Sequence, residues 1–367
     1  MTTARDQRSA LVFGASGFLG RWLVTELLDQ GVPTTAAVRS AASARALMSW
    51  LRDHGVATEG LQHLLVDLTV DGLGIGTDAP PQVREVYNAA GAYAFGMTQQ
   101  EARAGHVETT RRIVDLSATL GVQRMVHVSG YRVGGQDPAS VPWSPRRIAS
   151  EYGRLGAYEA SKVESDAVVQ AAAHELGVPL TIANPSTVIG HSVTGESDQT
   201  LGLATTVLDL IAGRLRAIPG GSSVFVPVVT VDYLTRFMVL LPTLEQTAGA
   251  SYWILDPDTP PLPDLLRLIG EHHHVRVPRL RLPVQLIRLL PTSLTHAAPE
   301  TLSFLSTDRY PTGPAEDLAR AHGLRHADVA TSLRRWSDHL ASRGAPRPPN
   351  APQPAVWNLQ NSSRRFG

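Results

Sequence analysis

Three glycines stand at the junction between the first predicted strand and the first predicted helix. The segment LVFGASGFLG places Gly14, Gly17 and Gly20 three residues apart, after an apolar run at 10–13 and before an amphipathic stretch at 18–30. Glycines with this spacing permit a tight turn, let another backbone approach closely and let the helix pack on the strand. The helix N-terminus then presents N–H groups and the positive end of its dipole to a phosphate. This turn therefore predicts a nucleotide-binding unit.

The same alternation of short β-branched runs and longer amphipathic stretches continues along the first half of the chain. Further strands are predicted at 34–38, 63–66, 86–87, 125–128 and 180–183, and further helices at 41–54, 98–120 and 157–176. Strands separated by helices of this length indicate parallel βαβ units. The predicted fold class is α/β, a Rossmann-type doubly wound parallel sheet with a small, mostly helical C-terminal cap.

The alternation stops after Asn184, and this change suggests the domain boundaries. We expect residues 1–190 to form the nucleotide-binding Rossmann domain, with its sheet completed by parts of 220–260. Residues 191–343 are expected to form a substrate-binding cap. Residues 344–367 are rich in Pro, Asn and Arg, a composition that predicts a disordered tail.

Composition excludes several classes of function. The 33 basic and 33 acidic residues cancel, which argues against a nucleic-acid partner. The absence of cysteine excludes disulfides, thiolate metal sites and cysteine nucleophiles. No apolar run reaches the ~18 residues of a membrane span, and the polar start argues against a secretory signal, so we expect a cytoplasmic protein.

A run of three histidines, His272 to His274, is the one sequence feature that could suggest a metal. Adjacent residues on a helix point in different directions, whereas ligands on one helix usually need i, i+4 spacing. The sequence therefore predicts no metal site.

The end of the second predicted strand indicates which dinucleotide binds. An acidic side chain at this position would bond the ribose 2′-hydroxyl, whereas an arginine suits a 2′-phosphate. The chain has Arg39 and Ser40 there. NADP(H) is therefore predicted in preference to NAD(H).

Taken together, the motifs resemble the extended short-chain dehydrogenase/reductase family, and within it the thioester reductase domains. The matching segments are GASGFLG (14–20), VDLT (66–69), NAAG (88–91), VSG (128–130), YEASK (158–162) and NPSTVIG (184–190). The turn, the strand ends and the resemblance together imply the following cofactor-binding residues: Gly14, Ser16, Gly17, Phe18, Leu19, Gly20, Arg39, Ser40, Asp67, Leu68, Ala89, Ala90, Tyr158, Lys162, Pro185 and Ser186.

By the same resemblance, Tyr158 and Lys162 are the catalytic pair, and the chemistry of the two side chains supports this. On a helix they are i and i+4 and share one face. A phenol with a pKa near ~10 is a weak acid at neutral pH, and a neighbouring ammonium stabilises its phenolate. Lys162 is the only lysine in the chain, while every other basic residue is arginine. The alternative, a chance Tyr-x-x-x-Lys on a surface helix, leaves this isolated ammonium unexplained.

Two positions depart from the family pattern. Gly130 stands where the family usually has a serine or threonine that polarises the substrate oxygen, with Ser129 one residue early and Tyr131 one late. His106 stands where the family usually has asparagine. Either Ser129 or Tyr131 supplies the missing hydrogen bond and His106 joins the proton relay, or oxyanion stabilisation is weak at a cost of roughly 10²–10³ in rate. Both Ser129 and His106 also have a purely structural alternative.

The predicted function is that of an NADP(H)-dependent oxidoreductase in biosynthesis. Its catalytic residues would be Tyr158, Lys162 and Ser129, and it would reduce a ketone, an aldehyde or an acyl thioester of a hydrophobic small molecule. A cofactor-recycling epimerase, dehydratase or isomerase, or a catalytically weakened nucleotide-binding protein, remain alternatives. The two long helices suggest a homodimer by resemblance. The residues expected to line the substrate cleft are Tyr93, Tyr131, Trp143 and His191.

Overall fold

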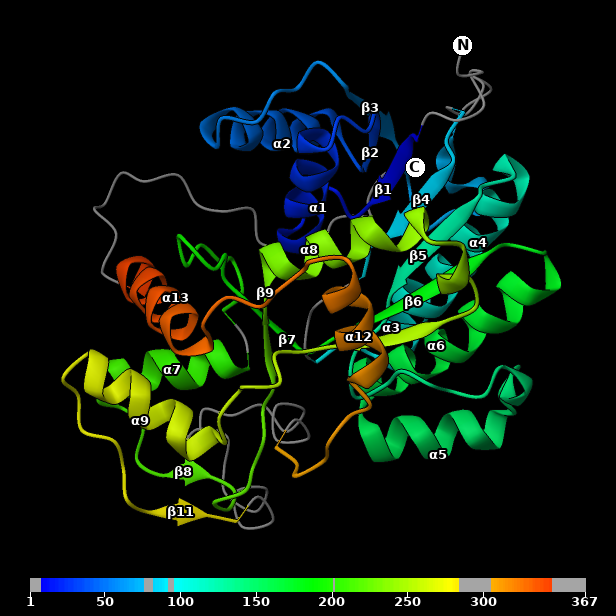
Figure 1. Cartoon of the computed structure of the whole chain (residues 1–367). Coiled ribbons are helices and arrows are strands. Elements are labelled where there is room, and N and C mark those ends of the chain that lie inside the picture. The colour runs from blue at the N-terminus through cyan, green and yellow to red at the C-terminus, as the bar shows by residue number, and fades with distance from the viewer. Residues whose placement is uncertain (1–7, 76–81, 92–95, 201, 284–304, 345–367) are drawn as a thin grey trace, which may run out of the picture.

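A seven-stranded parallel sheet forms the centre of the molecule. The computed structural model describes residues 8–75, 82–91, 96–200, 202–283 and 305–344, and Figure 1 shows their arrangement. The strand order is β10-β6-β5-β4-β1-β2-β3, with every neighbouring pair parallel. The strands are β1 (Ala10–Phe13), β2 (Thr34–Val38), β3 (Leu61–Leu65), β4 (Glu85–Asn88), β5 (Arg124–Val128), β6 (Leu180–Pro185) and β10 (Ser251–Ile254). The predicted fold class is confirmed.

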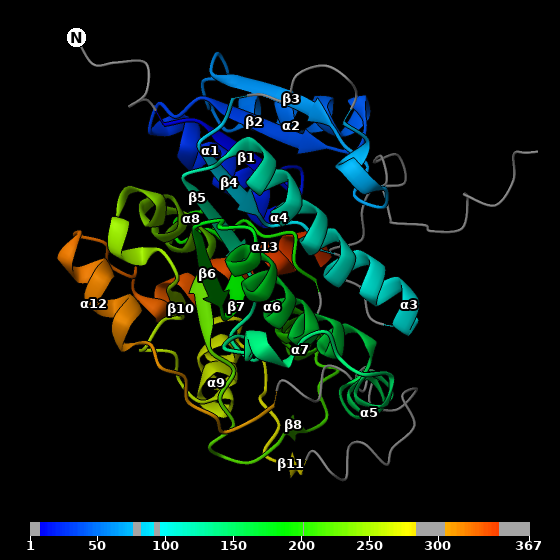
Figure 2. The ribbon, with the colours of Figure 1, turned by 90° about the vertical axis from the view of Figure 1, so that its right-hand side faces the viewer.

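Helices cover both faces of this sheet, as its strands require. Strands β1, β2 and β4 are buried along their whole length, which is typical of a parallel sheet between two helical layers. Figures 1 and 2 show α1 (Phe18–Asp29) and α8 (Val231–Leu240) on one side, and α4 (Thr109–Leu120) and α6 (Ala157–Glu175) on the other. Helix α2 (Ala41–Asp53) joins the α1 side, where one apolar cluster includes Leu23, Leu47 and Phe237.

The strand order reverses at β1, and this reversal places the site. The chain runs outward from β1 to β2 and β3 on one side, and to β4, β5 and β6 on the other. Ligands of doubly wound folds bind at the carboxyl ends of the strands, next to such a switch point. Here Phe13 pairs with Asn88 at the ends of β1 and β4, so the glycine turn and the NAAG segment meet at this edge.

The helix predicted at 98–120 has an irregular middle. It begins with a capping box of Thr98 and Glu101, and short α3 (Gln99–Ala102) follows. Residues Arg103–Glu108 then form a π-helical segment before α4. A π segment inserts extra residues into the helix, and such segments are frequent at functional sites. His106 lies within it and is buried.

The sequence of 130–156, with Pro138, Pro142 and Pro145, predicts a long loop, but the structure has a helix there. Helix α5 (Pro145–Leu155) begins after Ser144, whose hydroxyl accepts a hydrogen bond from the Arg147 N–H at 3.2 Å. The prediction of a loop is wrong because a serine cap followed by proline starts a helix. Trp143 packs with Tyr152 and with Ala160 of α6, which holds α5 against α6.

The smaller part of the molecule has its own core. Helices α7 (Leu203–Ile211), α9 (Leu262–His272) and α13 (Val329–Gly344) share an apolar cluster that includes Trp336. Two small parallel sheets adjoin it: β7 (Thr187–Ile189) with β9 (Val228–Thr230), and β8 (Ile218–Pro219) with β11 (Arg281–Leu282). Helix α12 (Gly313–Ala321) instead contacts β10 of the main sheet.

Two predictions from the sequence concern membrane spans and the C-terminal tail. Within the described ranges, no helix combines the length and the apolar character needed to cross a bilayer. The tail predicted at 344–367 lies, from residue 345 on, outside the described residues.

Candidate active site

The glycine turn has the shape that a bound pyrophosphate needs. Gly14 adopts φ +77°, and a Cβ there would lie 2.6 Å from the carbonyl oxygen of Ala89. A Cβ on Gly20 would collide with the Gly14 carbonyl, so the first turn of α1 packs directly on the end of β1. Gly17 caps α1 without a side-chain hydrogen bond to the helix N–H groups. Those N–H groups are therefore available to phosphate oxygens.

The ends of β2 and β3 carry the residues predicted at the adenosine end. Arg39 is exposed directly after β2. Ser40 caps α2, accepting from the Ser43 N–H at 3.1 Å. After β3, the Asp67 carboxylate accepts from both the N–H and the hydroxyl of Thr69, and these hydrogen bonds lower the pKa of Asp67. Asp67 is thus ionised and fixed beside the edge where the ribose is expected.

The ends of β4 and β6 carry four more of the predicted cofactor-binding residues. Ala89 and Ala90 are half-buried, and the Ala90 N–H donates to the Asn88 side chain at 3.1 Å. Pro185 ends β6, and the hydroxyl of the following Ser186 is buried without a hydrogen-bond partner among the described residues. A buried, unsatisfied hydroxyl is costly unless a ligand completes it. This hydroxyl and the uncapped N–H groups at the glycine turn both fit a dinucleotide.

Helix α6 presents Tyr158 and Lys162 at the same edge. The Lys162 ammonium donates to the Val128 carbonyl oxygen at the end of β5, at 3.4 Å. Burial lowers the pKa of Lys162 to about 8, and the negative charge of Asp166 opposes this shift. Most Lys162 side chains are therefore charged at neutral pH, but they lose the proton in mildly alkaline solution.

Asp166 lies one turn further along α6 and is fully buried. One carboxylate oxygen accepts from the Ser129 hydroxyl at 2.6 Å. The other accepts from the Gln136 N–H and the Gln170 side-chain amide, both at 3.0 Å. Burial raises the pKa of Asp166, while these hydrogen bonds and the Lys162 charge oppose the rise. Asp166 thus joins the end of β5, the loop after it and α6 into one network.

His106 reaches helix α6 from the π segment. The Ser161 hydroxyl donates to the Tyr158 carbonyl oxygen at 2.9 Å, so it accepts from His106 Nδ1 at 2.8 Å. The His106 ring also stands edge-on to the Tyr158 ring, with centroids 5.5 Å apart. A Cβ on Gly91 would lie 3.6 Å from His106 Nε2, which places this ring beside the end of β4. The histidine therefore contacts Tyr158 and lies beside the segment that follows β4.

Comparison with known proteins now identifies the family. A family model described as male sterility protein, an NAD-binding domain, matches residues 12–238. The chain belongs to this family. The predicted relationship to the extended short-chain dehydrogenase/reductases of thioester-reductase type is confirmed, and the chain contains an NAD(P)-binding domain.

Individual relatives agree with this assignment. Sterol demethylase protein B of Methylococcus capsulatus is 30% identical over 240 residues, covering 62% of this chain and 65% of that protein. Cinnamoyl-CoA reductase 1 of Oryza sativa subsp. japonica is 24% identical over 234 residues, covering 61% and 65%. The match thus spans slightly less than two thirds of each relative.

A solved structure shares the fold over nearly the whole chain. The terminal R domain from the myxalamid PKS-NRPS biosynthetic pathway superposes with a TM-score of 0.73 at 20% identity, covering 92% of this chain and 91% of that one. The likeness includes the C-terminal region, which the family model does not reach.

The residues predicted to line the substrate cleft occupy different environments. Tyr131 is buried, with its ring edge-on to Tyr310 at 5.0 Å. The Trp143 ring packs between α5 and α6. The Arg147 guanidinium lies over this ring, with its Cζ 4.5 Å from the ring centroid. His191 is half-buried against Trp22, with ring centroids 4.7 Å apart. Tyr93 lies outside the described residues.

Two contributors to the site were missed in the sequence. Asp166 follows Lys162 by four residues, as Lys162 follows Tyr158, so all three share one face of α6. This spacing could have predicted that Asp166 belongs to the site. Ser161 lies between that face and the π segment, and its bond to His106 depends on the irregular helix. No local pattern predicts that contact.

Proposed function

We propose that this chain is an NADP(H)-dependent oxidoreductase that reduces the carbonyl group of a hydrophobic acyl thioester, with ketones and aldehydes as related substrates. The observation that carries the proposal is the single lysine of the chain. It lies one helical turn after Tyr158, with its amine at the carboxyl edge of β5 and its pKa lowered to about 8. The names of the relatives, a cinnamoyl-CoA reductase and an R domain of a PKS-NRPS pathway, favour a thioester carbonyl.

The chain would hold the cofactor with groups from four elements. N–H groups at the start of α1 would bind the pyrophosphate, and Arg39 would pair with the 2′-phosphate. Ser186 would donate its unsatisfied hydroxyl near the end of β6, and the Lys162 ammonium would donate to a ribose hydroxyl. Bound NADPH would supply a hydride to the substrate carbonyl carbon.

Tyr158 gives the proton that completes the addition of hydride and H⁺ across the carbonyl. A ketone or aldehyde then becomes an alcohol, whereas a thioester becomes a hemithioacetal, whose C–S bond breaks to leave an aldehyde and the free thiol. Its phenol donates to the carbonyl oxygen as negative charge develops there, and the adjacent ammonium stabilises the phenolate that remains. At pH 7 about nine-tenths of Lys162 is charged, given its pKa of about 8. His106 braces the Tyr158 ring through their edge-on contact.

Ser129 enters the mechanism less directly than its position in the sequence suggests. Its hydroxyl donates to Asp166, so polarising a substrate oxygen would require that bond to break. We therefore assign to Tyr158 the larger share of oxyanion stabilisation. Weak stabilisation by a second donor would make the enzyme slow with unactivated ketones.

Steady-state oxidation of NADPH with a long-chain acyl-CoA, a ketone and an aldehyde tests the proposal. Tyr158→Phe should lower kcat by about 10²-fold or more with every substrate that the wild type reduces. Tyr252→Phe, on β10, is the matched control and should keep wild-type rates. Equal rates for wild type and Tyr158→Phe would refute the proposal. Tightly held nucleotide with no net NADPH consumption would indicate an isomerase instead.

A further inference from the structure

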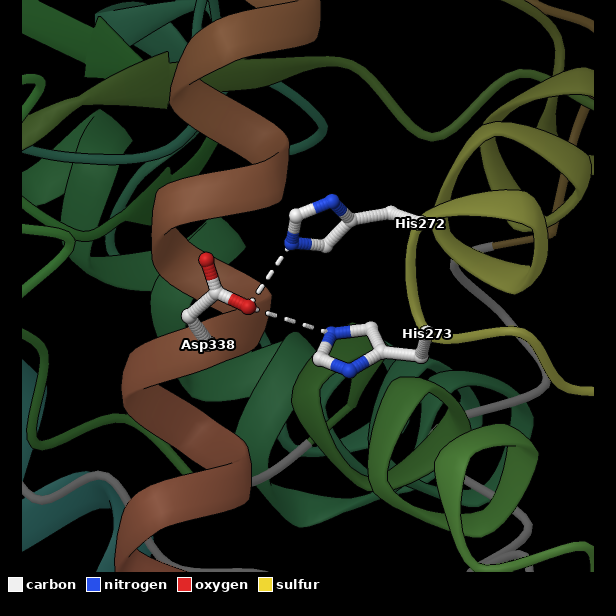
Figure 3. A group of neighbouring side chains, drawn as sticks. All are labelled: His272, His273 and Asp338. Carbon is white, nitrogen blue, oxygen red and sulfur yellow. Dashed lines mark hydrogen bonds and ion pairs between the residues drawn. The ribbon is translucent and has the colours of Figure 1, made fainter.

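Two histidine side chains and a carboxylate converge between α9 and α13, away from the nucleotide site. His272 Nε2 lies 2.7 Å from the Oδ1 atom of Asp338, and His273 Nε2 lies 3.7 Å from the same oxygen. Figure 3 shows both rings turned toward this one carboxylate. Among the described residues, no other group of three histidine, aspartate or glutamate side chains comes together in this way.

The end of α9 brings the two adjacent rings to the same side. His272 is the last residue of the helix, and His273 is its C-cap. His274 then takes φ +54°, and the Val275 N–H bonds back to the Gly270 carbonyl at 2.9 Å. This Schellman turn ends the helix without a glycine. Because the histidines stand at its end rather than within it, both rings reach the neighbouring helix.

The donor atoms suit a transition metal. Their ligand atoms all lie within 4.8 Å of one another. Zinc binds imidazole nitrogen and carboxylate oxygen at about 2.0–2.2 Å with tetrahedral geometry, which requires ligand atoms roughly 3.3–3.5 Å apart. Small side-chain rotations would bring the three ligand atoms, now up to 4.8 Å apart, to the separation that zinc requires. The negative end of the α9 dipole also favours a cation here.

The present hydrogen bonds show what a metal would replace. The Ser337 hydroxyl donates to the Arg334 carbonyl at 2.7 Å, so it accepts from His273 Nε2 at 2.8 Å. An ionised carboxylate can only accept hydrogen bonds, so His272 Nε2 donates to Asp338. Both Nε2 atoms thus carry protons in this arrangement. A metal would take their place and shift each ring to the tautomer protonated on Nδ1.

We propose that His272, His273 and Asp338 form a binding site for Zn²⁺ or a similar divalent transition metal, with water completing the coordination. The metal would join α9 to α13, the two helices that with α7 form the core of the smaller part of the molecule. Asp338 is 55% exposed, which leaves an entry path for the ion. The site is independent of the proposed reductase activity.

Calorimetric titration of the full chain with ZnCl₂, after removal of metal by a chelator, tests this site. We expect one Zn²⁺ per chain and a higher Tm in its presence. Asp338→Asn and His272→Gln should each weaken binding by at least about tenfold. His322→Gln, which changes the exposed histidine that follows α12, should bind as the wild type.

Two results would overturn the proposal. One is the absence of Zn²⁺ binding by the wild type. The other is binding of equal strength by wild type and Asp338→Asn, which would place the ion elsewhere. Asp338→Asn keeps an oxygen that can accept from His272, so its metal-free Tm should stay close to that of the wild type. This comparison separates loss of the site from loss of the fold.

Discussion

Removing the negative charge of Asp166 should shift the pH dependence of catalysis without dismantling the site. Asp166→Asn preserves all three hydrogen bonds. Its amide oxygen can accept from Gln136 and Gln170, while its NH₂ donates to the Ser129 hydroxyl, which can accept as well as donate. The one property lost is the charge that holds up the pKa of Lys162.

The size of the shift follows from the geometry of α6. Asp166 and Lys162 are i and i+4, so their Cβ atoms are about 5–6 Å apart. An opposite charge at such a distance changes a pKa by about 1–3, and the smallest shift takes Lys162 from about 8 to roughly 7. The charged fraction at pH 8 then falls from about one half to about one tenth. At pH 6 it stays above about nine-tenths in both proteins.

The assay is a profile of kcat/KM against pH for NADPH-dependent reduction. We expect Asp166→Asn to be about fivefold slower than the wild type at pH 8 and nearly equal at pH 6, with its alkaline limb moved down by about one pH unit or more. Asp232→Asn removes a buried carboxylate on α8 and should leave the limb in place. Coincident alkaline limbs for wild type and Asp166→Asn would refute the role assigned to Lys162.

Three further substitutions test the cofactor site and the fold. Arg39→Ala should weaken NADPH binding about 10–100-fold, and NADH binding much less, because only NADPH has the phosphate that the guanidinium pairs with; equal losses measured by fluorescence titration would contradict the predicted preference. Gly20→Ala should abolish binding of both dinucleotides, since its Cβ collides with the Gly14 carbonyl; retained affinity would show that the turn does not hold the pyrophosphate. Gly153→Ala should raise the free energy of unfolding by about 0.5–1 kcal/mol in urea, because this helical glycine has open space around its Cα; a loss of stability would argue against helix α5.

The sheet was predictable because each strand and helix carries its own local signal. Apolar β-branched runs indicate the strands, and Gly31 and Gly121, both at positive φ, follow the ends of α1 and α4. The sequence could not show that α12 returns to the main sheet, because only contacts between distant segments decide this. The π segment also has no local signature, since it depends on how His106 packs against Ser161.

The site was predictable only as far as side chains follow element geometry. The spacing of Tyr158 and Lys162 fixes their common face on any helix, and the glycine turn fixes its own backbone. Ser129 illustrates the limit, because its hydroxyl orientation depends on Asp166, a residue far away in the sequence. His272 and His273 illustrate it again. Their convergence on Asp338 depends on where α9 ends, at a left-handed His274 rather than a glycine, and on the packing of α13 beside that end.

Because Lys162 is the only lysine of the chain, its protonation state can be followed directly in the intact protein. Lysine labelled with ¹⁵N at Nζ would place one labelled side chain in the whole protein, and its resonance would follow the loss of the ammonium proton directly. The lowered pKa of Lys162 also exposes its amine to acylation by the proposed substrate. An acyl thioester acylates neutral amines, and a pKa of about 8 leaves some neutral amine at physiological pH. The Asp166 charge, by keeping Lys162 protonated, would then protect the enzyme from acylation by its own substrate.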